Sequence, residues 1–235
     1  GNYNASYTYT FTPAGPTVGA GGVISGMTVG TNYTVQASLG GCSSTASSSF
    51  SIAATLNCTF TCNTTFYLSQ YPAGGPTTLY TLNNTTNPFT ITAVGTSPAG
   101  MQVNGIGYNT VDKYMYGIHS VAAGDNRLIK IDANGTMTDL GIINTLPNTG
   151  YNNGTFDNAG NLYTSRYGTD KFYKINVTTK VATEIVLSRT IQVNDLVYDQ
   201  STGKFFGYEG AAGTDRLIPI NLTSATAGTV TNLPT

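Results

Sequence analysis

The sequence predicts an all-β protein in which a partial immunoglobulin-like β-sandwich, residues 1–55, precedes a β-propeller-type domain, residues 56–235. Three observations support this fold class. The chain is rich in Thr, Asn, Ser, Gly and Tyr, which suit pleated surfaces and tight turns. A short β-motif recurs four times in the second part, at a spacing typical of propeller blades. The first part lacks this motif and carries a different pattern of strands.

The first 55 residues have the pattern of the later half of a sandwich. The stretch YTYTFTP, residues 7–13, alternates in polarity as a strand does. In the later stretch VISGMTVGTNYTVQAS, Met27, Gly30 and Tyr33 have the spacing of a tyrosine corner. The stretch CSSTASSSFSIAA, residues 42–54, is expected to form the final strand.

An immunoglobulin-like sandwich needs about seven strands, and too few residues precede Tyr7 to supply the opening ones. We therefore expect the sequence to start partway through a domain. Such a sandwich has an unpaired edge and an open core, which a strand from another chain would complete in a filament. The competing interpretation, which we prefer, is that the sequence is part of a much longer polypeptide.

The second part contains four similar repeats, which predict blades. Each has a motif with apolar residues at alternate positions and a final Asp or Asn: LYTLN at 79–83, LIKID at 128–132, FYKIN at 172–176 and LIPIN at 217–221. An aromatic strand precedes each motif, and a turn with a further β-rich segment follows it. The last three repeats also open with GIGYN, GTFDN and DLVYDQ. Four short antiparallel strands make one propeller blade, and the opening strand of the first repeat is not evident.

Polar residues at the repeated turns predict hairpins rather than ligand sites. Asp begins and Gly ends the turns DNAGN, DQSTGK and DANG, which is the chemistry of a type I turn closed by a left-handed residue. The predicted structural turn residues are Asp132, Gly135, Asp157, Gly160, Asp199 and Gly203.

The stretches TFTCNTTFYLSQ, GIGYNTVDKYMYGI, RLIKIDANG, GTFDNAGNLY and DLVYDQSTGKFFGY together resemble a known family. It is an uncharacterised, propeller-like repeat domain of large secreted bacterial surface proteins, and the resemblance covers residues 57–235. The leading module is similar to tandem immunoglobulin-like modules of adhesin-like proteins, which are commonly exported by the type IX secretion route. The resemblance implies a propeller-like fold and an extracellular, cell-surface location. It supplies no catalytic residues that could be transferred to this sequence. The carboxy-terminal TAGTVTNLPT departs from a type IX sorting domain.

Charge and hydropathy exclude two classes of partner. Charged residues make up 9% of the chain and the net charge is -1, so the counterion release that drives nucleic-acid binding is absent. The longest apolar runs are far shorter than the roughly 20 residues of a transmembrane helix. No signal peptide precedes Gly1, so an exported chain is expected to be already processed or trimmed. Other surface-protein domains, copies of this chain or glycans remain as expected partners.

The three cysteines are predicted to be structural, because the single histidine, His119, lies far from all of them in sequence. At least one of Cys42, Cys58 and Cys62 lacks an intrachain partner. In an extended strand Cys58 and Cys62 would lie too far apart to form a disulfide, so a turn between them or a Cys42 to Cys58 bridge stays open as an alternative. Ten Asn-x-Ser/Thr sequons occur, which a chain of this composition also produces by chance. The candidate glycosylation acceptors in the repeats are Asn134, Asn153, Asn176 and Asn221.

Metal and catalytic sites are not predicted, and no cofactor is expected. The turn DNAGN has Ala159 where a calcium loop needs an oxygen ligand. His119 has no triad motif around it. A paired-carboxylate hydrolase or lyase is kept as an alternative, with candidate carboxylates Asp112, Asp157, Asp199 and Glu209. We predict no enzyme, because these carboxylates lie mostly at repeated turns or strand ends.

Aromatic residues of the repeats are predicted to pack between blades, since one face of each blade must be buried against its neighbour. They are Tyr67, Tyr114, Tyr116, Tyr163, Phe172, Tyr173, Phe205 and Phe206. Ligand contacts are expected in loops such as SQYPAGGPTT and SVAAGDN. Arg166 and Asp170 lie in the loop between the middle strands of the third repeat and remain candidate functional residues. The predicted role is structural or adhesive, with a carbohydrate-binding module as an alternative.

Overall fold

The computed structural model describes residues 3–52, 58–61, 64–120, 126–211 and 214–231. The chain divides into two compact units, Gly1–Asn57 and Cys58–Thr235, and each is described by itself. Within the described residues the structure is all-β, with one short 3-10 turn, Ala20–Gly22, and no α-helix. No helix among them is long and apolar enough to span a membrane.

The first unit contains one three-stranded and one two-stranded antiparallel sheet. In the larger sheet the order is β1-β4-β5, and Tyr9 and Phe11 of β1 lie opposite Ala37 and Val35 of β4. Because side chains alternate across a strand, all four share one face of the sheet. The strands are β1 (Thr8–Thr12), β2 (Thr17–Val18), β3 (Ile24–Ser25), β4 (Thr34–Leu39) and β5 (Cys42–Ser43).

A tyrosine corner fixes the entry to β4. Tyr33 is only 3% exposed, and its hydroxyl oxygen accepts a hydrogen bond from the backbone N–H of Thr28 at 3.0 Å. Gly30 lies between them with φ of 75°, a conformation that favours glycine. A hydrogen bond between the hydroxyl of a strand tyrosine and the backbone a few residues upstream defines a tyrosine corner.

The segment after β5 is less regular than the predicted final strand. The Ser44 and Ser47 hydroxyls accept hydrogen bonds from the backbone N–H groups of Ala37 and Val35, at 3.1 and 3.0 Å. Because hydroxyl oxygens replace carbonyls along this side of β4, the ladder is interrupted after Ser43. It returns only as an isolated bridge at Phe50.

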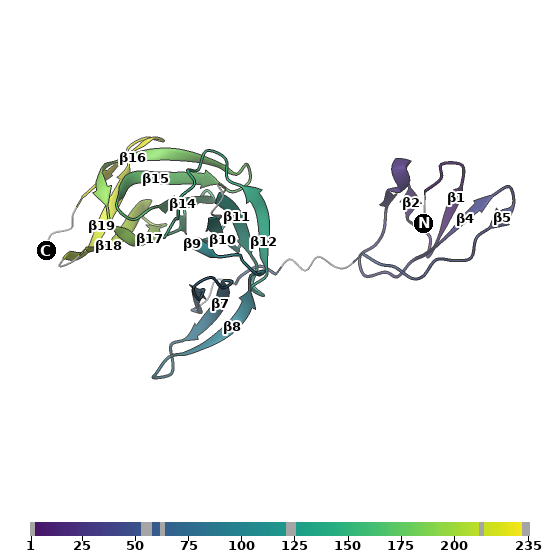
Figure 1. The fold of residues 1–235 in the computed structure, drawn as a ribbon, viewed down its shortest axis with the longest axis horizontal. Helices are drawn as coiled ribbons and strands as arrows, with labels where there is room; N and C mark the ends of the chain where they lie inside the picture. Colours follow the sequence, from purple (N-terminus) through teal and green to yellow (C-terminus); the bar gives the residue numbers. More distant parts are fainter. Residues whose placement is uncertain (1–2, 53–57, 62–63, 121–125, 212–213, 232–235) are drawn as a thin grey trace. The chain divides into compact units, whose positions relative to one another are not determined.

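The second unit is a propeller-type domain built from four successive antiparallel meanders, as predicted (Figure 1). Blade 1 has three strands in the described residues, and blades 2 to 4 have four each. Blade 1 is β6 (Phe66–Gln70), β7 (Thr78–Asn83) and β8 (Thr90–Thr96); blade 2 is β9 (Val103–Asn109), β10 (Tyr114–Ser120), β11 (Asn126–Ile131) and β12 (Met137–Ile142). Blade 3 is β13 (Thr155–Phe156), β14 (Asn161–Ser165), β15 (Thr169–Asn176) and β16 (Val181–Ile191); blade 4 is β17 (Val193–Asp199), β18 (Lys204–Ala211), β19 (Thr214–Leu222) and β20 (Ala227–Val230).

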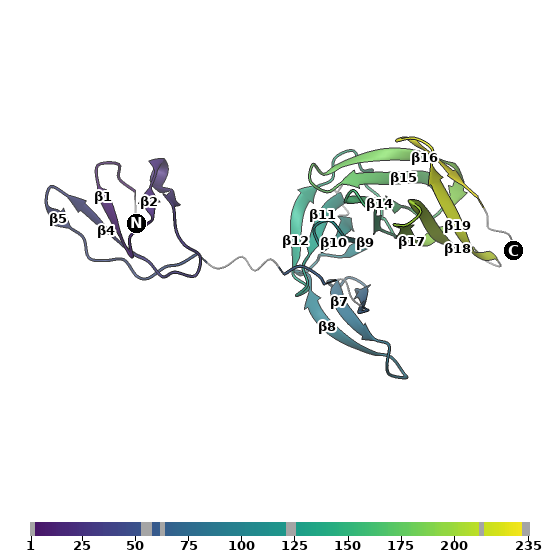
Figure 2. The same cartoon turned by 180° about the vertical axis from the view of Figure 1, so that it is seen from behind.

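The blades follow one another along an arc, and their order within the sheets is regular. Figure 1 shows β9, β14 and β17 toward the inside of the arc and β12 and β16 on its outside. The view from behind shows the same order (Figure 2). Blades 3 and 4 are joined by parallel pairing of β16 with β20, which makes one sheet of eight strands.

Apolar clusters between neighbouring blades form the core. Leu79 of blade 1 packs with Met115 and Ile129 of blade 2, and similar clusters join blades 2 and 3 and blades 3 and 4. Each buried large apolar side chain contributes roughly 1.5–3 kcal/mol. The predicted packing role is confirmed for every one of these aromatics except Phe206, which belongs to none of the three clusters. Buried are Tyr114, Tyr116, Tyr163, Phe172, Tyr173 and Phe205, while Tyr67 and Phe206 are half-buried.

Glycines allow the inner strands of blades 2 and 3 to touch through their backbones. A Cβ on Gly154, just before β13, would lie 2.1 Å from the carbonyl oxygen of Gly105 in β9. Gly105 itself has φ of 59°. No side chain fits at this contact, so its glycines set the distance between the two blades.

Aspartate side chains cap the repeated hairpins. The Asp157 carboxylate accepts hydrogen bonds from the backbone N–H groups of Ala159 and Asn161, both at 2.9 Å. Asp132 accepts from Asn134 and Thr136, and Asp199 accepts from Ser201. The closing glycines have left-handed φ values of 76°, 78° and 70° at Gly135, Gly160 and Gly203.

A buried carboxylate links blade 3 to blade 4. Glu209 in β18 is 3% exposed, and the Arg189 guanidinium of β16 donates to both of its oxygens at 2.9 and 3.0 Å. Arg216 donates to it at 2.8 Å, and the backbone N–H of Gln192 does so at 2.9 Å. These donors, with Arg189 foremost, hold the pKa of Glu209 at about 2.

We predict that Glu209→Gln lowers the free energy of unfolding at pH 7 by about 3 kcal/mol, because it removes the anion of a buried ion pair. The pKa of a glutamate in the unfolded chain is about 4.3. The contribution of Glu209 is therefore complete above this value and is lost as the pH falls toward 2. Urea denaturation between pH 7 and pH 3 is expected to show the difference between the two proteins shrinking.

The matched control is Glu184→Gln. Glu184 pairs with Lys171 at 2.6 Å, but their side chains are 43% and 38% exposed. This surface pair is expected to contribute less than about 1 kcal/mol. An equal loss in the two variants would contradict a special role for Glu209.

We predict that Gly154→Ala lowers the free energy of unfolding by about 1–3 kcal/mol, since the new methyl group forces the backbones of blades 2 and 3 apart. The control is Gly150→Ala, where a Cβ would meet nothing within 4 Å. Its effect is expected within about 0.5 kcal/mol of zero. Urea denaturation measures both, and equal effects would refute the close contact as a constraint.

Candidate functional site

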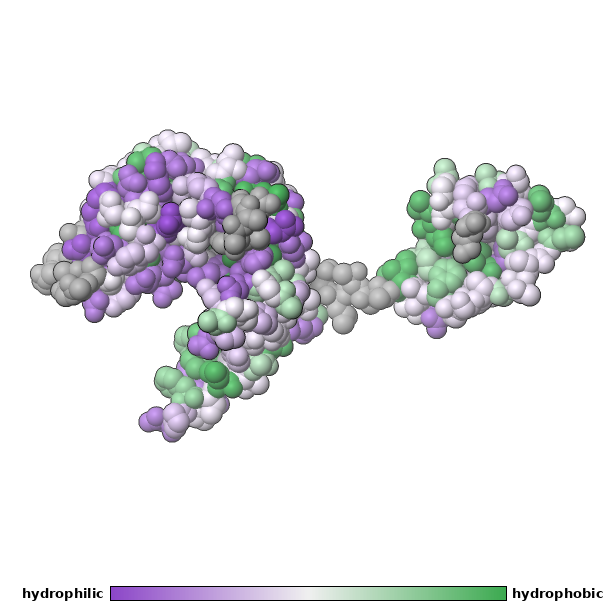
Figure 3. Space-filling model, in the orientation of Figure 1, coloured by the Kyte–Doolittle hydropathy of each residue, from purple (hydrophilic) through white to green (hydrophobic). Residues whose placement is uncertain are grey.

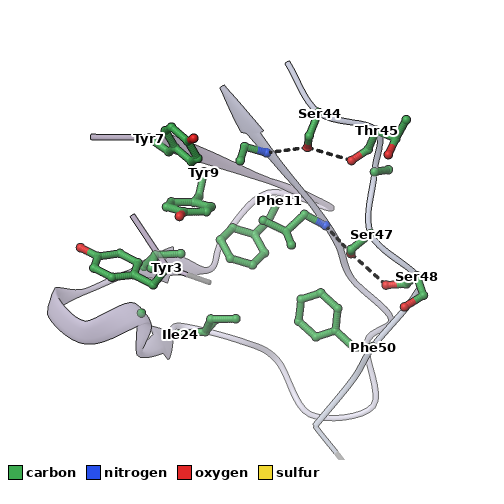
Figure 4. Close-up of a pocket in the computed structure, with 15 residues that line it drawn as sticks. Tyr3, Tyr7, Tyr9, Phe11, Ile24, Ser44, Thr45, Ser47, Ser48 and Phe50 are labelled. Carbon is green, nitrogen blue, oxygen red and sulfur yellow. Dashed lines mark hydrogen bonds between the residues drawn. The ribbon is translucent and has the colours of Figure 1, made fainter. Parts of the chain in front are cut away.

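The first unit has a groove of about 570 Å³ on the apolar face of its larger sheet, shown in Figure 4. We call it the N-terminal groove. Strands β1, β3 and β4 and the segments before β1 and after β5 supply its walls. Its principal lining residues are Tyr3, Tyr7, Tyr9, Phe11, Ile24, Val35 and Phe50.

Aromatic rings in the N-terminal groove contact one another but stay partly in water. Tyr3 stacks on Tyr9 with ring centroids 6.0 Å apart, and Phe11 meets Phe50 edge-on at 6.4 Å. Tyr3 and Tyr7 are each 39% exposed. Contiguous apolar surface of this kind is typical of interaction sites on soluble proteins.

Strand β1 leaves one edge of the sheet open. The backbone N–H groups of Val35 and Ala37 point to the serine segment, away from β1. Their cross-strand neighbours Phe11 and Tyr9 therefore direct their own N–H and C=O groups outward, because hydrogen-bonding direction alternates along antiparallel strands. No other strand of the described residues pairs with this outer edge.

Charged residues, the usual protection of an open edge, are absent here. The chain has no Asp, Glu, Lys, Arg or His before Asp112, so the first unit and blade 1 carry none. Natural edge strands are commonly blunted by Lys, by inward-pointing charges or by bulges. In Figure 3 the surface of the first unit is mainly white and green, while strongly hydrophilic colours lie on the second unit. This edge and groove therefore have the chemistry of a contact surface.

A second groove, of about 330 Å³, lies in the second unit beside β6. We call it the propeller groove. Tyr67 and Ser69 of β6 form one wall, and Asn104, Ile106 and Tyr108 of β9 form another, with Asp195 of β17 among the other residues. It holds one carboxylate and no cation, so its lining is largely neutral.

Each of the candidate carboxylates has hydrogen-bond partners of its own. Asp112 accepts hydrogen bonds from the Tyr116 hydroxyl at 2.6 Å and from the Tyr114 backbone at 3.2 Å. Asp157 caps its own hairpin, and Glu209 is held by Arg189 on another strand. Each carboxylate thus has a local structural role.

Asp199 is also unsuited to act as a general acid. Hydrogen bonds from the hydroxyls of Thr202 and Ser201 and from the Ser201 backbone lower the pKa of Asp199 to about 2. A glycosidase acid instead needs a raised pKa. These hydrogen bonds are those of an aspartate that caps a hairpin turn.

His119, Arg166 and Asp170 line neither groove. His119 Nδ1 lies 2.8 Å from the backbone oxygen of Gln102, on the neighbouring strand segment. Arg166 is exposed and Asp170 half-buried, and neither lines a groove described above. The loop SQYPAGGPTT contributes Ser69 to the propeller groove, whereas residues 121–125 of SVAAGDN lie outside the described residues.

Among the residues described, no group of three or more His, Cys, Asp or Glu side chains is placed to hold a metal ion. Cys42 and Cys58 are free thiols, so the bridge between them that the sequence left open is not formed. Cys62 lies outside the described residues.

The structure corrects one candidate glycosylation acceptor. Asn153 is 2% exposed; its amide donates to Ser165 Oγ at 3.0 Å and to the Val193 carbonyl at 3.2 Å. In the folded chain this side chain is inaccessible to a transferase. Asn134 and Asn176 are exposed, and Asn221 is half-buried.

Sequence reasoning did not identify the propeller groove. Its walls come from β6, β9 and β17, which are more than 120 residues apart at the extremes. The one available signal was the lack of an evident opening strand in the first repeat, because an incomplete blade leaves space beside its first strand.

Residues 67–235 match the family model described as "Repeat of unknown function (DUF6923)". No curated protein matches the chain. Among solved structures, virginiamycin B lyase from Staphylococcus aureus is 12% identical, with a TM-score of 0.46, over 94% of this chain and 77% of that one. TolB from Acinetobacter baumannii is 11% identical, with a TM-score of 0.47, over 98% of this chain and 58% of that one.

An auxiliary nutrient binding protein from Bacteroides thetaiotaomicron is also similar, at 12% identity and a TM-score of 0.46, over 98% of this chain and 64% of that one. This chain therefore spans less than two thirds of the length of TolB and of the nutrient binding protein. Likenesses of this strength assign no activity to it.

Proposed function

This chain belongs to the DUF6923 family of repeats, and we propose that it is an extracellular structural or adhesive module of a bacterial surface protein. The proposal rests chiefly on the N-terminal groove. An aromatic groove beside an open, uncharged strand edge is suited to hold another polypeptide, and no charged side chain lines it.

The occupant best suited to the N-terminal groove is an extended strand of a neighbouring chain. Main-chain groups of Tyr9 and Phe11 would pair with its backbone, and the groove would take its alternate apolar side chains. Contacts of this kind join copies into filaments or join modules of a large adhesin. The tyrosine corner at Tyr33 supports an immunoglobulin-like origin for the unit.

Composition supports an extracellular location. A chain with only 9% charged residues, rich in Thr, Asn and Ser and with capped hairpins, suits a rigid exported β-protein. A role as an enzyme has less support, because Asp112, Asp157, Asp199 and Glu209 are each committed to local hydrogen bonds.

We predict that the chain self-associates as its concentration rises and that Thr10→Lys weakens this association at least about tenfold. Thr10 is exposed on the face of β1 opposite the groove, so the lysine leaves the groove lining intact while it protects the edge against pairing. Sedimentation velocity of both proteins across micromolar concentrations measures the effect.

The matched control is Thr183→Lys, an exposed position in β16, which is paired with β15. It is expected to associate as the unchanged chain does. A chain that stays monomeric throughout, or equal weakening by both variants, would reject assembly through β1. Specific signals on a glycan array would instead favour the carbohydrate-binding alternative.

A further inference from the structure

We propose that blade 1 of the propeller is a strand acceptor: the open edge of β6 and the propeller groove bind an extended, uncharged peptide segment. This site lies in the second unit and does not depend on the N-terminal groove. The occupant would pair antiparallel with β6 and take the place of an innermost strand.

The internal repeat shows that β6 lacks a neighbour. In blades 2, 3 and 4 the equivalent strands β10, β14 and β18 pair on both sides, with β9, β13 and β17 as their inner partners. Strand β6 pairs only with β7 in the described residues. One row of backbone N–H and C=O groups of β6 is therefore open to another strand.

The described residues just before blade 1 are held elsewhere. The Phe60 backbone N–H donates to the Lys113 carbonyl, and the Ala133 N–H donates to the Cys58 carbonyl, both at 2.8 Å. Both hydrogen bonds attach this segment to hairpins of blade 2. The buried Phe60 ring meets Tyr67 and Tyr108 edge-on, so it stands beside the open edge without pairing to it.

The propeller groove lies where an inner strand would lie. Strand β9 buries one row of residues and presents the alternate row, Asn104, Ile106 and Tyr108, half-exposed to the groove. On its buried side the next blade approaches until Gly105 and Gly154 touch. A strand bound in the groove would contact β9 from the side opposite to blade 3. By analogy with the contact between Gly105 and Gly154, it needs small residues where the two backbones come closest.

The charges that line the site restrict the composition of the peptide that it can bind. Blade 1 has no charged residue, and the groove contributes the single carboxylate of Asp195. Along β6 a buried charge of either sign would have no partner, and an acidic segment would also meet the carboxylate of Asp195. The inner strand VNGIGYN of β9 has the required chemistry: it is uncharged, extended and contains two glycines.

The test uses the complete chain and a VNGIGYN peptide with one added amino-terminal tryptophan. The chain contains no tryptophan, so the indole of the peptide gives the sole tryptophan fluorescence. We expect saturable binding, and slower amide exchange at Phe66–Gln70 when the peptide is present. A peptide with proline in place of its isoleucine loses a backbone donor and is expected to bind at least about tenfold more weakly.

Two variants locate the site. Ser69→Trp fills the groove and is expected to reduce binding at least about tenfold, whereas Gln70→Trp, at the exposed end of β6, is expected to have little effect. For these two proteins the peptide carries a fluorescein label instead of tryptophan. Absence of binding, equal binding of the proline peptide, or unchanged exchange at β6 would each overturn the proposal. Protection at β6 by a neutral monosaccharide alone, without the peptide, would also overturn it.

Discussion

The pairing of strand edges is the constraint on which this structure depends. A sheet is stable in water when each edge is paired, covered or made unattractive by charge. In blades 2 and 3 the strands equivalent to β6 are paired on both sides, and a glycine contact brings the inner strands of these two blades together. Blade 3 also shares its outer strand β16 with β20 of blade 4, and Glu209 fastens the same two blades with buried hydrogen bonds. The first unit and blade 1 leave an edge open, and their sequences contain no charge to protect it.

Local chemistry made much of the fold predictable from the sequence. Asp157 and Gly160 identify a hairpin because one caps the turn and the other adopts its left-handed conformation. The alternation in LIKID and FYKIN identifies strands because each must bury one face. The irregular course after Ser43 was not predictable in this way, since serine hydroxyls that replace backbone acceptors leave no change in the alternation of polarity.

The sites were harder to predict, because they depend on what is next to a strand rather than on the strand itself. Asn104 and Asp195 meet in one groove only after blades 2 and 4 are placed around the same interior. The burial of Asn153 follows from Ser165 and Val193, which no sequon pattern reveals. The tyrosine corner of the first unit was predictable, because the spacing of Met27, Gly30 and Tyr33 is local in the sequence.

The absence of charge up to residue 111 has a consequence for the setting in which such a protein works. Contacts between neutral, aromatic-lined edges gain nothing from electrostatic steering, so they form slowly. They also lose nothing to ionic screening. A connection built on these edges would therefore hold equally well at low and at high ionic strength.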